Sequence, residues 1–133
     1  MTAPVAGETD LERMLATLDV ERREGTYTFV TGEWPGLEPV AQASIVEAEG
    51  RTSVVSVAAA CAAGAPVEFV AAWLTLTVHS SLEAVGLTAA FSRVLGDAGI
   101  PCNVLAGFHH DHLLVPDDRS DEAIALLRAL SSR

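Results

Sequence analysis

The second half of this 133-residue chain contains a strand, a helix, two closely spaced strands and a second helix in a fixed order. The first strand is predicted at Val67–Val78, where apolar residues alternate with mixed ones and so define one apolar face. A helix is predicted over Val85–Ala98, where apolar residues recur at helical spacing, and Gly99 and Pro101 end it. This order leaves few ways in which the segment can fold.

The remaining elements of the second half predict a hairpin and a closing helix. Strands are expected at Cys102–Phe108 and His112–Val115, and a helix at Asp121–Leu130 with Ser120 as its N-cap. The order is that of a ferredoxin-like βαββαβ unit without its final strand. Because such a sheet would have an unpaired edge, we expect the first half to supply a fourth strand, most simply Thr26–Thr31.

The first half resembles a degenerate copy of the second. Its predicted elements, in order, are a helix at Thr9–Asp19 with Thr9 and Glu12 at capping-box spacing, a strand at Thr26–Thr31, a Pro- and Gly-containing loop, a hairpin at Ser44–Ala48 and Arg51–Val57, and a helix at Ala58–Ala63. We therefore predict an α+β fold of two tandem, interleaved ferredoxin-like units with antiparallel sheets and helices on one face. The expected domains are 1–66 and 67–133.

Composition excludes several classes of protein. Half of the residues are apolar and the mean hydropathy is +0.33, so most of the chain is expected to fold. No apolar run approaches the roughly 18 uncharged residues of a spanning helix. The net charge is −10 and the eight basic residues, all Arg, are scattered, which disfavours nucleic acid and anionic membranes as partners.

The two cysteines and the N-terminus indicate the compartment. Cys61 and Cys102 lie in apolar sequence surroundings, which is typical of reduced, buried thiols rather than a disulfide. Residues 1–4 lack the basic and apolar regions of a secretory signal. We expect a cytoplasmic protein.

Two long runs carry a resemblance to a known family. They are WLTLTVHSSLEAVGLTAA at residues 73–90 and IPCNVLAGFHHDHLLVP at residues 100–116. Together they resemble small bacterial proteins made of two ACT-type domains, which are similar to the ACT pairs of aspartate kinase regulatory regions and of CASTOR-type arginine sensors. The resemblance implies two ACT-like units, a non-catalytic regulatory protein that binds a small amino acid or related metabolite, and a homodimer or other homo-oligomer.

Physical chemistry favours a ligand site at one end of the second unit. The segment between Val78 and Gly86 precedes a helix, whose first N–H groups suit a carboxylate, and Ser80 and Ser81 add hydroxyls. Asp111 in the hairpin could hold an ammonium or guanidinium group. By analogy with the CASTOR-type sensors, Phe108 and Asp111 face the ligand. The candidate ligand-binding residues are His79, Ser80, Ser81, Leu82, Glu83, Val85, Gly86, Leu87, Asn103, Phe108, His109, His110 and Asp111.

Other interpretations of these residues stay open. The four histidines, His79, His109, His110 and His112, invite a metal site, but consecutive strand residues point to opposite faces, so no metal or other cofactor is predicted. Ser80 and Glu83 also have the spacing of a helix cap. No catalytic motif is present, so we expect no enzyme activity. The alternatives to a sensor are a structural or partner-binding dimerisation module without a ligand and, third, a metal-dependent enzyme.

Overall fold

The structure is a computed structural model, and it describes residues 10–78 and 85–132. Its strands form one seven-stranded sheet in the order β3-β4-β2-β5-β7-β6, with β1 beside β5, and every pair is antiparallel. The strands are β1 (Val20–Arg22), β2 (Tyr27–Thr31), β3 (Ala43–Glu47), β4 (Gly50–Ser56), β5 (Ala71–Leu76), β6 (Asn103–Ala106) and β7 (Asp111–Pro116). The helices are α1 (Leu11–Thr17), α2 (Val57–Ala63), α3 (Leu87–Asp97) and α4 (Ser120–Ala129), with short 3-10 turns at Glu38–Val40, Asp117–Arg119 and Leu130–Ser132.

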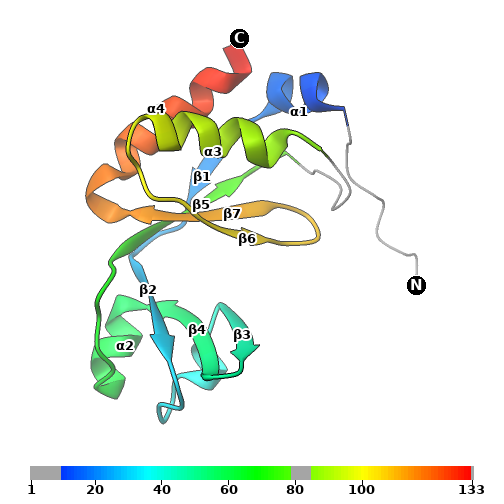
Figure 1. Ribbon diagram of the computed structural model, residues 1–133. Helices are drawn as coiled ribbons and strands as arrows, with labels where there is room; N and C mark the ends of the chain where they lie inside the picture. The colour runs from blue at the N-terminus through cyan, green and yellow to red at the C-terminus, as the bar shows by residue number, and fades with distance from the viewer. Residues whose placement is uncertain (1–9, 79–84, 133) are drawn as a thin grey trace.

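Three helices cover one face of the later strands. Figure 1 shows α1, α3 and α4 on the same side of β1, β5, β7 and β6. The alternation along β5 explains this layer, because Leu74 and Leu76 are fully buried beneath the helices and pack with Phe91 of α3. None of the described helices lies over the opposite face of these strands in Figure 1, and the candidate site lies on that face.

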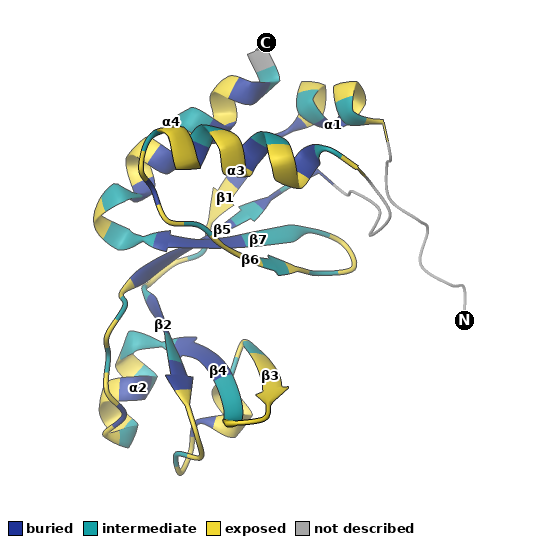
Figure 2. Cartoon of the chain, in the orientation of Figure 1, coloured by how far each residue is buried: buried dark blue, intermediate teal, exposed yellow. Residues whose placement is uncertain are grey.

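The remaining strands form a smaller layer with α2. Strands β2, β4 and β3 curl below the larger unit in Figure 1, and α2 packs against β2 and β4. Their core contains Val30, Val55 and Ala60, while β3 at the sheet edge is largely exposed (Figure 2). The α+β fold of two tandem, interleaved ferredoxin-like units is therefore confirmed, with the first unit lacking a full first helix.

The predicted fourth strand does come from the first half, but it is mainly a different segment. Strand β1 pairs with β5 from Val20 opposite Leu76 to Arg22 opposite Leu74. The expected segment, β2, meets β5 only where Tyr27 lies opposite Ala71. Strand β1 has no alternating pattern of its own, and its place is set by burial of Val20 in the core beneath α4.

Helix α1 also packs with the later elements. Met14 is fully buried and Leu18 is nearly so, both in the core that β5, α3 and α4 share. Two segments of the first half thus complete the second unit, and the division of the chain at 1–66 and 67–133 stays a prediction.

Some predicted element ends differ from the structure. The N-cap of α1 is Asp10, whose carboxylate accepts a hydrogen bond from the Arg13 N–H at 3.1 Å, and Thr9 lies outside the described residues. Ser120 does not cap α4; it is buried as the first helical residue, where its hydroxyl bonds to Arg22. The first strand of the second half is shorter than predicted because residues 67–70 form the connection out of α2.

The expectation for the thiols was wrong at one position. Cys61 is exposed on the outer side of α2, whereas Cys102 is half-buried. Burial raises the pKa of the Cys102 thiol to about 11.

Within the described residues, no helix has the length and apolar character needed to cross a bilayer.

Candidate ligand site

The structure brings the predicted hairpin to the end of β5. The His110 ring nitrogen Nδ1 lies 3.4 Å from the carbonyl oxygen of Val78, the last described residue before the predicted loop. The candidate residues His79, Ser80, Ser81, Leu82 and Glu83 lie outside the described residues. The hairpin and the beginning of the predicted loop therefore meet at one end of the second unit.

Three further candidates surround the start of α3. Gly86 is the N-cap, with a φ of +100°, and a Cβ there would lie 3.0 Å from Leu11 Cδ2 of α1. Leu87 is buried in the core and Val85 is exposed. Gly86 is thus required by the backbone and by α1, so Gly86→Val would strain the fold and would not isolate an effect on binding.

The hairpin candidates occupy different positions. The Phe108 side chain is about half exposed and contacts His109 edge-on, with 5.1 Å between ring centroids. Asp111 begins β7 opposite Ala106. Asn103 lies at the far end of β6, where its amide donates to the Leu114 carbonyl oxygen at 3.5 Å. The candidates therefore do not converge on a single point.

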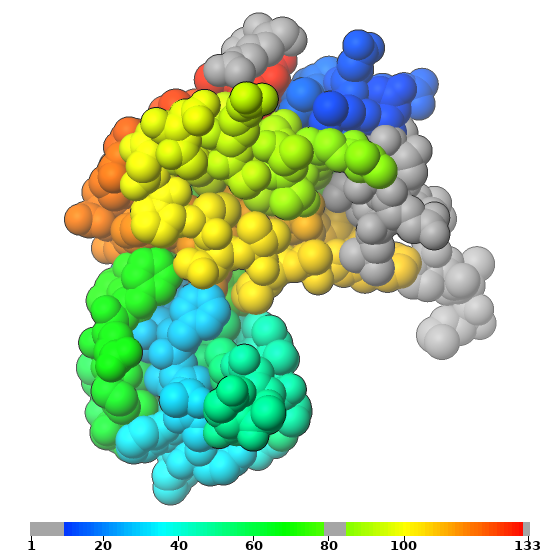
Figure 3. Space-filling model, in the orientation of Figure 1, coloured from blue at the N-terminus to red at the C-terminus, as the bar shows by residue number. Residues whose placement is uncertain are grey.

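Two adjoining cavities lie on the open face of the sheet. The hairpin cavity has a volume of about 350 Å³, and its lining is Glu21, Arg22, Arg23, Thr75, His110 and His112. The tryptophan cavity has a volume of about 270 Å³, and its lining is Arg23, Gln42, Ala43, Trp73, Leu105, Ala106, Gly107 and His112. Arg23 and His112 border both. Figure 3 shows the surface hollowed between the β6–β7 hairpin and the region of β3 and β4.

Of the predicted site residues that the structure describes, His110 is the one that lines the hairpin cavity. Sequence reasoning missed Glu21 and Arg23 because it placed no strand at Val20–Arg22. Trp73 and Thr75 could have been found from the alternation along β5, because its mixed face lies opposite the helices.

Arg23 places a cation at the wall that the two cavities share. Its guanidinium lies 4.0 Å from the centre of the Trp73 ring, and Nη1 donates to the Gln42 side-chain oxygen at 3.1 Å. It forms no ion pair with any residue that the structure describes. A guanidinium fixed on an aromatic ring at a cavity wall suits recognition of a carboxylate.

His112 lies on the floor between the two cavities. Its Nδ1 is 3.2 Å from the Trp73 indole nitrogen and 2.9 Å from Thr75 Oγ1. Because an indole N–H can only donate, Nδ1 accepts and the ring proton sits on Nε2. Burial, reinforced by Arg23, lowers the pKa of His112 below its usual value of 6.5. The ring is therefore neutral at pH 7 and offers Nε2–H as a donor.

Gly107 leaves room beside this histidine. A Cβ at Gly107 would lie 2.9 Å from the His110 carbonyl oxygen and 3.3 Å from His112 Nε2. Any side chain would press on the hairpin backbone and on the wall of the tryptophan cavity.

Across the part of the chain that is described, no three His, Cys, Asp or Glu residues are placed to hold a metal ion.

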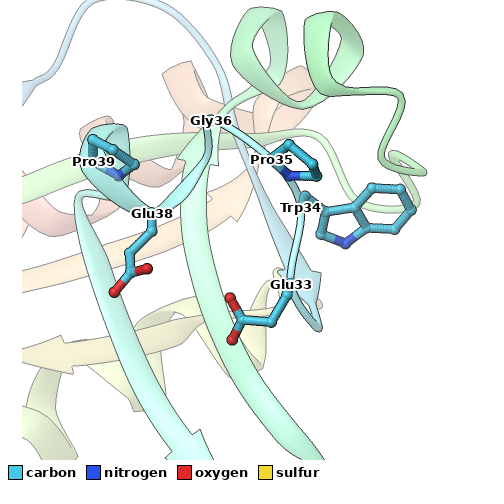
Figure 4. Close-up of a pocket in the computed structure, with 6 residues that line it drawn as sticks. All are labelled: Glu33, Trp34, Pro35, Gly36, Glu38 and Pro39. Carbon is cyan, nitrogen blue, oxygen red and sulfur yellow. The ribbon is translucent and has the colours of Figure 1, made fainter.

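A further pocket lies on the loop after β2, away from the predicted site residues. It has a volume of about 360 Å³, and Figure 4 shows its lining of Glu33, Trp34, Pro35, Gly36, Glu38 and Pro39. The Trp34 indole donates to the Thr31 carbonyl oxygen at 3.0 Å, and Glu33 lies 3.8 Å from Arg51 Nε. These contacts hold the loop in shape and point to no particular ligand.

Comparison with known proteins places the fold. Two ACT domain models match this chain, one over residues 6–72 and the other over residues 68–129. A Vibrio cholerae protein of unknown function, described as a possible transport protein, is 37% identical with a TM-score of 0.81, over 91% of this chain and 95% of that one. No curated protein sequence matches significantly.

More distant structures share the fold alone. An Agrobacterium tumefaciens protein has 15% identity and a TM-score of 0.61, over 86% of this chain and 89% of that chain. The ligand-free regulatory subunit of aspartate kinase from Thermus thermophilus has 9% identity and a TM-score of 0.60, over 87% and 97%. With two domain models that together span residues 6–129 and a structural relative above one-third identity, the chain belongs to the ACT domain family as a tandem ACT pair.

Proposed function

We propose that this protein is a non-catalytic regulatory protein that binds a small amino acid and transmits the binding through a change in the arrangement of its units or subunits. The tandem ACT architecture supports a regulatory role, since the aspartate kinase neighbours from Thermus thermophilus and Thermus flavus are regulatory subunits. A ligand can act in this way only through different affinities for two arrangements of the protein.

The observation that carries the proposal is the hairpin cavity. It lies beside His110 of the predicted hairpin, on the face of the sheet opposite α1, α3 and α4, and charged side chains line it. Arg23 provides a cation that is not used by any described carboxylate. A cavity with such a cation suits a small ligand that carries a carboxylate.

A thermal-melt screen of the full chain against the twenty amino acids tests this function. A ligand at about one hundred times its Kd stabilises the folded state by about 2.7 kcal/mol, so the Tm should rise by several degrees for the true ligand. The same melts with a chelator separate amino-acid binding from binding that needs a metal. Absence of a shift with every amino acid would contradict the proposal.

A dimerisation module without a ligand is the second candidate. Strand β3 ends the sheet, and its Ile45 and Val46 side chains are 56% and 76% exposed. An exposed apolar edge strand can pair with a second chain. This function predicts a Tm that rises with protein concentration and does not respond to any amino acid.

A further inference from the structure

Glu21 and Arg23 border the same cavity with opposite charges that do not neutralise each other. They are two residues apart on an extended segment, so their side chains leave the same face of the sheet. Glu21 is exposed and makes no hydrogen bond or ion pair with any described residue, and Arg23 has no acidic partner in the same part of the chain. The two charges therefore remain available to a ligand between them.

Polar groups on the two neighbouring strands form a short row with Glu21. Glu21 lies opposite Thr75, which in turn lies opposite His112 on the next strand. The Thr75 hydroxyl donates to His112 Nδ1, so its lone pairs can accept from an ammonium group. The His112 Nε2–H is a further donor, and His112 borders both cavities together with Arg23. Acceptors thus gather near Glu21 and donors near Arg23.

The tryptophan cavity continues from Arg23 away from Glu21. Besides Arg23, Gln42 and His112, its walls are apolar: Ala43, Trp73, Leu105, Ala106 and Gly107. It contains no acidic residue, and the missing side chain at Gly107 keeps it open. This cavity suits an uncharged aliphatic group attached to a carboxylate that Arg23 holds.

From this geometry we propose that the open sheet face binds a neutral aliphatic L-amino acid as its zwitterion. The carboxylate is held by Arg23, the ammonium group by Glu21 and Thr75, and the side chain enters the tryptophan cavity. This inference rests on the proposed function and names its ligand class and its contacts, at a position apart from the start of α3.

Calorimetric titration of the full chain with L-leucine tests the assignment. Glu21→Gln and Arg23→Gln each remove one charged hydrogen bond, so the Kd should rise at least about tenfold in each variant. Arg93→Gln on α3 and Glu68→Gln before β5 remove the same charges at exposed positions elsewhere and should leave the Kd unchanged. Melts without ligand establish that the variants are folded.

Two leucine analogues test the same contacts on the unaltered protein. Isocaproate lacks the ammonium group and isopentylamine lacks the carboxylate, so each should bind at least about tenfold more weakly than L-leucine. Isocaproate binding as tightly as L-leucine would overturn the role of Glu21. Isopentylamine binding as tightly would overturn that of Arg23.

The outcomes separate this inference from the proposed function. If L-leucine binds and neither Glu21→Gln nor Arg23→Gln weakens it, the zwitterion site is wrong while amino-acid binding stands. If L-leucine fails to bind and a charged or polar amino acid binds instead, the aliphatic assignment is wrong. If none of the twenty amino acids binds, both proposals fail.

Discussion

The neighbours of His112 on the open face of the sheet determine its hydrogen bonds and lower its pKa. The Trp73 indole and the Thr75 hydroxyl both meet its Nδ1, and the Arg23 guanidinium lies over the same tryptophan ring. Burial and the nearby cation disfavour a second proton, which is why the pKa falls; His110 acts in the same direction and Asp111 opposes them. Neutral His112 is thus part of the folded arrangement that borders both cavities.

This gives stability a defined dependence on pH. Because the pKa of His112 is lower in the folded chain, the unfolded chain takes up the proton first as the pH falls through the usual value of 6.5. The free energy of unfolding should therefore decrease from about pH 7.5 to about pH 5.5, and His112→Asn should reduce this decrease. Urea unfolding at both pH values measures it, with His109→Asn as the matched control. An identical pH dependence in His112→Asn and the wild type would contradict the prediction.

At the scale of elements, β1 joins the two halves of the chain. Arg128 of α4 donates to Asp19 at 2.8 Å and to the Val20 carbonyl oxygen at 3.0 Å, while Arg22 bonds to Ser120 and pairs with Asp117. The Asp19 carboxylate accepts hydrogen bonds from the Val20 N–H and from Arg128, and these two bonds lower its pKa. Exposed ion pairs contribute little, so the burial of α1 and β1 is the larger stabilising effect.

Truncation of α1 tests this packing. Met14 is fully buried among residues of the second half, so Met14→Ala should lower the free energy of unfolding by about 2–5 kcal/mol. Glu12→Ala, on the exposed side of the same helix, should change it by less than about 0.5 kcal/mol. Denaturant unfolding of both variants provides the comparison. Equal stability of Met14→Ala and Glu12→Ala would show that α1 does not support the second unit.

At the scale of the whole molecule, β3 and β6 lie at the two ends of the strand order of the curled sheet. Strand β3 exposes Ile45 and Val46, and β6 at the other end exposes Val104. An edge with apolar side chains offers both backbone hydrogen bonds and apolar area to a second copy. Association of two copies through such an edge is therefore the arrangement we expect.

Light scattering tests the expected assembly. At roughly tens of micromolar, the mass should be that of a dimer or a larger symmetric oligomer. Val46→Lys places a charge on the β3 edge and should shift the mass toward a single chain if this edge is the interface, whereas Val85→Lys, the same change at an exposed valine before α3, should leave the mass unchanged. A single-chain mass for the wild type, unchanged by amino acids, would contradict the expectation.

The sequence by itself determined the order of elements from β5 to α4 and the membership in the ACT family. The apolar periods of β5 and α3 and the hairpin at 103–116 are local properties, so they could be read without a fold. The first hairpin and α2 were predictable for the same reason, from Gly50 and the Ala-rich run. Gly86 stays a predicted ligand-binding residue; the structure shows that its φ of +100° and the nearby Leu11 side chain favour glycine at this position.

Only the tertiary structure decided the fourth strand and the open-face cavities. Val20–Arg22 has no period long enough to predict a strand; it becomes one because the free edge of β5 supplies hydrogen-bond partners and α4 covers Val20. That pairing then carries Glu21 and Arg23 to the face that holds Thr75, Trp73 and His112. These residues are distant in sequence. They are brought together by backbone hydrogen bonds between strands, which do not depend on the pattern of side chains.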